Sequence, residues 1–129
     1  MNKWGPRSRA ALATCRPPLV LVADKVLEII NCSAIWGARG EEDQNAAFDA
    51  GYSKVRWSDS GHNVVPPDLS PCLDLVPYPT CYQSTREQWF EFGGIVMGVA
   101  HALGVELEWG GRWTRPFDPG HFQLPRGQW

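Results

Sequence analysis

The sequence predicts a small α+β domain. Runs with apolar residues at helical intervals and short runs of strand-forming residues both occur, but they follow no repeating βαβ order. The chain has 129 residues, which is enough for one domain with its own core and leaves little room for a second. We therefore expect a single domain, 1–129, in which strands and helices are mixed rather than doubly wound.

The first half of the chain predicts two helices and one strand. Apolar residues at helical spacing predict a helix over 18–30, and the apolar run 32–36 predicts a strand. A second helix is expected over 41–50, because acidic residues occupy its first turn and Gly51 can end it. Residues 51–71 have no clear period, and so long an irregular stretch in a small domain is typical of a functional or disordered loop.

The second half contains the clearest helix, over 85–103. An apolar stripe runs along it, and Ser84 with Glu87 forms a capping-box pattern at its start. Short strand-forming runs on either side predict the remaining strands, with a loop between the last two. We place these strands at 73–76, 105–109 and 121–124, and the loop at 110–120.

Charge and hydropathy exclude two classes of partner. The formal net charge is −2, and the basic residues of segment 3–16 suggest a solvated stretch rather than a nucleic-acid-binding arm. No stretch approaches the roughly 20 apolar residues that span a bilayer. The apolar run 19–23 follows two prolines and is too short for the core of a signal peptide. We expect a monomer made in the cytoplasm without a signal peptide, with neither nucleic-acid binding nor membrane insertion.

The four cysteines lack the paired spacing of a structural zinc ribbon. Reduced and largely buried thiols are the favoured interpretation. A Cys72–Cys81 disulfide closing a short loop is the alternative.

Two histidines and two carboxylates stand in positions that suit a metal site. His62 lies in the long irregular stretch, and Asp74 lies inside an apolar strand, where a carboxylate needs a cation or strong donors. Asp118 precedes His121 by three residues. Two imidazoles and one carboxylate with an open fourth position are a common catalytic zinc site, in which the metal activates water and polarises a carbonyl. Asp118 could then act as the general base.

Spacing alone leaves another interpretation open. His62 could be an ordinary loop histidine, Asp118 a turn residue, and Asp74 a carboxylate satisfied by backbone donors. The third histidine, His101, falls near the end of the predicted 85–103 helix, where a structural or surface role is expected.

Several motifs in a fixed order extend this pattern over nearly the whole chain, from about residue 8 to 124. Together they resemble the phage-type branch of the VanY-like peptidases. This branch belongs to the LAS group of D-alanyl-D-alanine carboxypeptidases and L-alanyl-D-glutamate endopeptidases. The motifs are Gly37–Gln44, Gly51–Lys54, Ser60–His62, Ser70–Tyr78, Leu103–Val105, Trp109–Trp113 and Asp118–Phe122.

The resemblance implies a small domain whose antiparallel sheet, with flanking helices, carries one catalytic zinc ion. By motif position, His62, Asp74 and His121 match the zinc ligands, and Asp118 matches the catalytic acid and base. Arg39 matches an arginine that faces the substrate, where its charge could stabilise an oxyanion or bind a carboxylate; a surface salt bridge is its alternative role. Weaker matches to substrate-binding or bracing positions are Gln44, Ser60, Trp109 and Trp113, although the tryptophans could simply be core.

Three departures from the family pattern bear on substrate preference and on support of the metal ligands. The interval from His62 to Asp74 is longer than in the compact bacterial form. Arg112 stands where the Trp-Gly-Gly loop usually carries an acid, and Gln123 stands where a glutamate is expected.

The resemblance implies a phage endolysin-like enzyme that hydrolyses a peptidoglycan stem peptide, at the L-Ala–D-Glu bond. We expect no separate cell-wall-binding domain, and we expect the enzyme to reach the wall after a membrane pore forms. One alternative is a D-Ala-D-Ala carboxypeptidase with the same zinc chemistry. The other, of a different class, is a non-catalytic zinc-stabilised binding or structural module.

Overall fold

An antiparallel sheet forms the centre of the computed structural model, which describes all residues, 1–129. The strand order is β1-β2-β4-β3, and every neighbouring pair is antiparallel. Every residue of β2 is buried, because neighbouring strands and packed helices cover it. The strands are β1 (Cys32–Trp36), β2 (Cys72–Pro77), β3 (Glu108–Trp109) and β4 (His121–Gln123).

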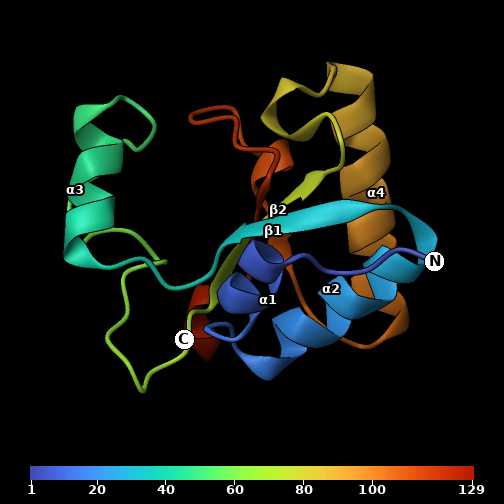
Figure 1. The fold of residues 1–129 in the computed structure, drawn as a ribbon, viewed down its shortest axis with the longest axis horizontal. Helices are drawn as coiled ribbons and strands as arrows, with labels where there is room; N and C mark the ends of the chain where they lie inside the picture. Colours follow the sequence, from blue (N-terminus) through green and yellow to red (C-terminus); the bar gives the residue numbers. More distant parts are fainter.

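Helices cover the sheet unevenly (Figure 1). α2 and α4 pack on each other and on β2, α1 packs on β1, and α3 lies apart from this group, at the other end of the molecule. No helix combines the length and the apolar character needed to cross a membrane. The helices are α1 (Pro6–Leu12), α2 (Pro17–Ile29), α3 (Glu41–Asp49) and α4 (Arg86–Ala102), with short 3-10 turns η1 (Cys81–Gln83), η2 (Gly110–Arg112) and η3 (Arg126–Gln128).

The core lies between the sheet and the pair formed by α2 and α4. Apolar side chains spaced at helical intervals on both helices meet the inward face of β2 and β4. Burying each such side chain contributes about 1.5–3 kcal/mol, so this layer dominates the stability of the fold. Its largest fully buried members include Leu19, Val26, Leu75, Phe92, Val96 and Phe122.

The fold class and most elements agree with the sequence-based expectations, and the clearest difference is an additional helix in the N-terminal segment. Lys3, Arg7 and Arg9 are exposed, as expected of a solvated stretch, but the same segment forms α1, whose Ser8 and Leu12 are buried. Ser8 Oγ accepts a hydrogen bond of 3.0 Å from the backbone N–H of Ala34, which ties α1 to β1. A helix of seven residues is too short for a clear period, which explains why the pattern was missed.

Two further boundaries differ from expectation. The strand expected over 105–109 pairs with β4 only at Glu108 and Trp109. The capping box of α4 is formed by Thr85 and Gln88, one residue later than predicted. Ser84 is unavailable for capping because its hydroxyl donates to the Cys81 carbonyl at 2.6 Å.

All four cysteines are free thiols, so the alternative of a Cys72–Cys81 disulfide is wrong. Cys15, Cys32 and Cys72 are buried. Burial raises the pKa of the Cys15 and Cys32 thiols to about 12, which keeps both neutral in the core.

The position of the capping box can be tested by mutation. We expect Thr85→Ala to lower the free energy of unfolding by about 1 kcal/mol, because the first turn of α4 loses its hydrogen-bond acceptor. Glu91→Ala, at an exposed position in the same helix, is the control and should change stability by less than about 0.5 kcal/mol. Urea denaturation followed by circular dichroism measures both. Equal stability of the two variants would contradict the assignment.

Candidate metal centre

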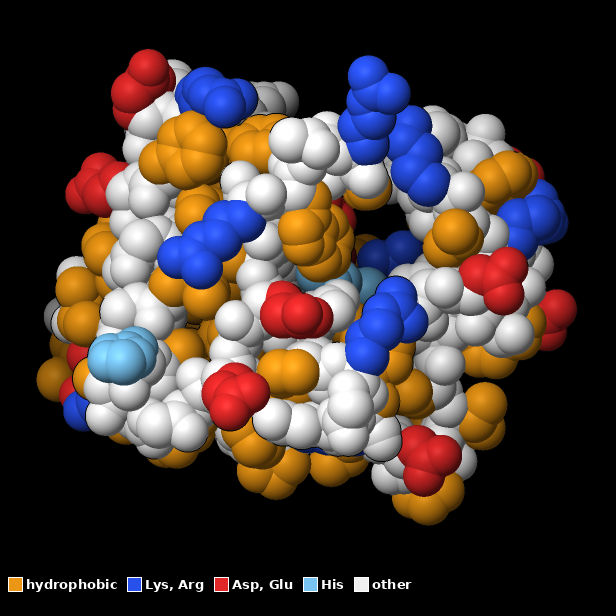
Figure 2. All heavy atoms as spheres, turned by 180° about the vertical axis from the view of Figure 1, so that it is seen from behind, with side chains coloured by type: hydrophobic (Ala, Val, Ile, Leu, Met, Phe, Trp, Pro, Cys, Tyr) orange, Lys and Arg blue, Asp and Glu red, His pale blue; other side chains and the backbone are white.

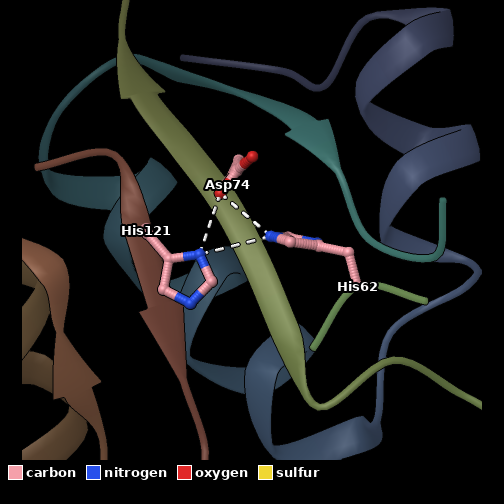
Figure 3. Close-up of side chains that lie close together, drawn as sticks. All are labelled: His62, Asp74 and His121. Carbon is pink, nitrogen blue, oxygen red and sulfur yellow. Dashed lines mark hydrogen bonds and ion pairs between the residues drawn. The ribbon is translucent and has the colours of Figure 1, made fainter. Parts of the chain in front are cut away.

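Three side chains from distant parts of the chain point toward one another (Figure 3). His62 comes from the irregular stretch before β2, Asp74 from β2, and His121 from β4. His62 Nε2 lies 3.2 Å from His121 Nδ1 and 3.2 Å from Asp74 Oδ1, and His121 Nδ1 lies 3.3 Å from Asp74 Oδ1. All three residues are buried. The structure therefore brings together the three residues that the family motifs marked as metal ligands.

The triangle has the size of one face of a tetrahedral zinc site. Ligand atoms 2.0–2.1 Å from a tetrahedral zinc ion are separated by about 3.3 Å. The donor set of two imidazoles and a carboxylate is also one that zinc accepts. In addition, Asp74 Oδ1 is buried and receives no hydrogen bond. An unpaired buried acceptor costs about 1–3 kcal/mol, and a cation in contact with Asp74 Oδ1 would remove that cost. The residues present fit a bound divalent metal.

Hydrogen bonds on the far side of each ring fix which nitrogen faces the centre. His62 Nδ1 lies 2.7 Å from the Gly37 carbonyl oxygen, which can only accept, so Nδ1 carries the proton and Nε2 presents its lone pair. On the other ring, His121 Nε2 lies 2.8 Å from Gln123 Oε1, and Nδ1 faces the triangle. Both rings are therefore oriented for ligation.

The end of β1 holds the loop that carries His62. The backbone N–H of Arg39 donates to the His62 carbonyl at 2.7 Å, and the His62 N–H donates to Ser60 Oγ at 3.2 Å. Gly37 approaches α1 so closely that a Cβ would collide with Thr14, the Ala11 carbonyl and Cys15. The absence of a side chain at Gly37 therefore lets the chain after β1 pack closely against α1 and the residues that follow it, at the point where the Gly37 carbonyl contacts His62.

Arg39 lies beside the triangle rather than on the surface. It is 8% exposed, its Nη2 lies 3.5 Å from Asp74 Oδ2, and its guanidinium lies 5.0 Å from the centre of the Trp36 ring. Its Nη1 donates to Gln44 Oε1 at 3.2 Å, while its buried Nε has no partner. Arg39 is therefore a buried residue beside the triangle, and the alternative of a surface salt bridge is wrong.

Gln44 is a bracing residue, fully buried on α3. Its amide nitrogen donates to Ser53 Oγ at 2.8 Å and to the Val55 carbonyl at 2.7 Å. Its amide oxygen accepts from Arg39 and, at 3.0 Å, from Asn63 Nδ2. Asn63 also donates to the Arg39 carbonyl at 3.2 Å, a role for which the sequence offered no signal. Gln44 thus holds α3, the irregular stretch and Arg39 together.

Asp118 lies next to the triangle without belonging to it. Its Oδ2 is 4.0 Å from His121 Nδ1, and its side chain is 46% exposed. Its backbone N–H donates to the Gly110 carbonyl at 3.0 Å, and its carbonyl lies so close to Gly110 that a side chain there would collide with it. A half-exposed carboxylate beside the metal ligands can exchange protons with solvent and with a bound substrate.

The two tryptophans of the Trp-Gly-Gly loop have different environments. Trp109 is buried and stacks on Phe122, with ring centres 6.2 Å apart, which matches the core alternative. The half-buried ring of Trp113 lies 5.3 Å from the His121 ring and forms part of the wall of the site. His101 is exposed at the end of α4, as expected for a surface residue.

A hollow gives access to this centre (Figure 2). Histidine side chains are visible at its floor, and Lys and Arg side chains gather around it. Asp and Glu side chains also lie beside the hollow in this view, so both signs of charge are present near the opening, and the buried Arg39 adds a positive charge next to the triangle.

The protonation of the centre follows from its packing. Burial by itself favours the neutral form of Asp74, but the charges and contacts of His62 and His121 lower its pKa well below the usual range. Burial lowers the pKa of His121, but its interactions with Asp74 and then with Cys72 together outweigh burial and raise the pKa well above 6.5. Burial first, and then the charge of Asp74, raise the pKa of Asp118. A metal that binds His121 must therefore displace the proton that this ring holds.

Comparison with known proteins agrees with this geometry. Residues 67–124 match the family described as D-alanyl-D-alanine carboxypeptidase, a segment that includes Asp74, Asp118 and His121 but not His62 or Arg39. The fold is similar to the crystal structure of the Serratia marcescens L-Ala D-Glu endopeptidase ChiX, with a TM-score of 0.77 and 26% sequence identity. That similarity covers 99% of this chain and 92% of the other. No curated protein matches in a sequence comparison. The family and structural matches confirm the resemblance to the VanY-like peptidases of the LAS group.

Proposed function

We propose that this protein is a zinc-dependent peptidase that hydrolyses an amide bond in the stem peptide of peptidoglycan. The observation that carries the proposal is the triangle of His62, Asp74 and His121, with the carboxylate of Asp118 4.0 Å from His121. This arrangement combines a site for one metal ion with a neighbouring base. The family match and the likeness to ChiX support peptidoglycan as the substrate.

Zinc suits the donor set and the ligand spacing, and the buried site excludes the larger oxygen-rich shells that calcium and magnesium prefer. A bound zinc ion would supply Lewis-acid chemistry, which activates water and polarises the scissile carbonyl. His62 and His121 would hold it through the nitrogens that already face the centre, and Asp74 through Oδ1.

Asp118 and Arg39 would provide proton transfer and charge stabilisation. Asp118 Oδ2, which lies 4.0 Å from His121 Nδ1, would accept the proton of the attacking water and return it to the leaving amine. Arg39 keeps a permanent charge beside Asp74, and that charge would stabilise the substrate oxygen that becomes negative or attract a substrate carboxylate. Trp113 would bound the cleft on the side of His121.

Among stem-peptide bonds we favour L-Ala–D-Glu. The likeness to an L-Ala D-Glu endopeptidase extends over 99% of this chain, whereas the match described as a carboxypeptidase is confined to residues 67–124. A D-Ala-D-Ala carboxypeptidase with the same zinc chemistry is the second candidate. A purely structural zinc site would have no use for a half-exposed carboxylate at this position.

The biological setting that we propose is an endolysin-like one. A phage enzyme of this kind would be made in the host cytoplasm and would act on the wall after passing through a membrane pore. The basic side chains around the hollow are compatible with a substrate that carries carboxylates.

Digestion of purified peptidoglycan tests the proposed bond. We expect the zinc-loaded protein to produce new N-terminal D-Glu and new C-terminal L-Ala, identified by mass spectrometry. Release of free D-Ala, without stem-peptide cleavage, would assign the carboxypeptidase activity instead. Absence of any cleavage with zinc bound would contradict a peptidase acting on this substrate.

The roles of Asp118 and His121 can be separated by mutation. We expect Asp118→Asn to keep bound zinc and to lose about 10²–10⁴-fold in activity, because only proton transfer is removed. His121→Ala should lose both zinc and activity, since a ligand is gone. Asp59→Asn, an exposed carboxylate in the irregular stretch, is the control and should retain both. Bound zinc is measured by atomic absorption. An active Asp118→Asn would remove this residue from the mechanism.

Zinc binding should depend on pH above the ordinary pKa of histidine. Because the folded protein raises the pKa of His121 well above 6.5, its proton still competes with zinc at pH 7. We expect affinity to rise from pH 6.5 upward, by at most about tenfold per pH unit for one displaced proton, and to level off above the pKa of His121. Competition with a chelator of known pH dependence measures this. A constant affinity between pH 6.5 and 8 would contradict it.

A further inference from the structure

We propose that Glu108 and Gln123 form a hydrogen-bonded relay that selects the tautomer of His121 and aims its Nδ1 at the metal. Both are positioning residues. Gln123 contacts His121 only at Nε2, the ring nitrogen that faces away from the triangle, and Glu108 contacts Gln123. The inference rests on the proposed zinc site and extends it to residues beyond the ligands.

The relay is a continuous chain of short contacts. His121 Nε2 lies 2.8 Å from Gln123 Oε1, and Gln123 Nε2 donates to Glu108 Oε1 at 2.9 Å. Glu108 pairs with Gln123 in the register of β3 and β4, so both side chains lie on the same face of the sheet. Gln123 is 6% exposed, whereas Glu108 is exposed to solvent. The chain thus leads from the surface to the buried ring.

The direction of the chain is fixed by the carboxylate. An ionised glutamate can only accept hydrogen bonds, so the amide nitrogen of Gln123 must face Glu108 and the amide oxygen must face His121. An oxygen facing the ring requires a proton on His121 Nε2. That tautomer leaves Nδ1 with a free lone pair, and Nδ1 is the atom that faces Asp74 and His62.

The relay also explains why glutamine at position 123 is compatible with a metal site. In this chain a glutamate at position 123 would place a buried carboxylate directly opposite Glu108, and like charges at paired positions are unfavourable. With glutamine the orienting charge lies one residue further out, on Glu108, where solvent stabilises it. The Gln123 amide orients the His121 ring without adding a charge to the core.

Zinc affinity of matched variants tests the relay. We expect Gln123→Ala to weaken zinc binding about 10–100-fold and Glu108→Ala to weaken it about tenfold, as is usual for groups that orient a metal-bound histidine. The double variant should bind zinc as Gln123→Ala does, because Glu108 acts only through Gln123. Glu106→Ala removes an exposed charge from the same segment and should bind like the wild type. Dissociation constants come from chelator competition on proteins whose circular dichroism spectra match.

A spectroscopic readout separates orientation from simple stability. In the zinc-loaded wild type, ¹⁵N NMR of histidine side chains should report a protonated Nε2 on His121. In Glu108→Ala this signal should broaden or lose its protection from exchange with solvent, while the signals of His62 stay unchanged. If Gln123→Ala does not fold, the comparison of Glu108→Ala with Glu106→Ala decides the question alone.

The outcomes separate this inference from the proposed function. A wild type that binds no zinc would overturn both. If the wild type binds zinc and Glu108→Ala binds it as tightly as Glu106→Ala does, the relay is overturned and the proposed metal site is retained. Additive losses in the double variant, or a proton on Nδ1 of His121, would also overturn it.

Discussion

The pairing of β2 with β4 is the constraint on which the site depends. In this register Asp74 lies opposite His121, and Leu73 lies opposite Phe122. Side chains alternate along a strand, so the first pair points to the metal centre and the second points into the core. A slip by one residue would move the ligands to the core face and the apolar pair to the site. The burial that stabilises Leu73 and Phe122 therefore also fixes the positions of Asp74 and His121.

The third ligand is positioned by a different means. His62 belongs to a stretch without regular structure, whose ordering costs conformational entropy. Hydrogen bonds to the end of β1 offset that cost: the Gly37 carbonyl fixes the ring, and Arg39 binds the His62 carbonyl. Gln44 then links the same stretch to α3. Because these contacts already orient the ring, a metal would have little left to order when it binds.

The sequence predicted the elements with long or strong patterns, and its family motifs marked the three residues that the fold brings together, but it did not predict the residues that support them. The strand Cys32–Trp36 followed from an apolar run and the long helix α4 from periodicity, and the assignment of His62, Asp74 and His121 as metal ligands stays a prediction. The partnership of Gln123 with Glu108 depends on the register of a two-residue strand, which no local pattern reveals. Likewise, Trp109 and Trp113 belong to one motif, yet only the fold assigns one to the core and the other to the site.

The charged side chains around the triangle influence the protonation of Asp118. Asp74 and Asp118 bring two carboxylates close to one point, and Arg39 offers one permanent positive charge nearby. After burial, the charge of Asp74 is the largest cause that raises the pKa of Asp118. A divalent cation held by Asp74 would neutralise that charge and reverse its effect on the neighbouring carboxylate. Asp118 would then be ionised when the metal is present and ready to accept a proton, which couples the base to the occupied site. The same carboxylate would thus hold the ion and, through its charge, influence the proton affinity of Asp118 beside it.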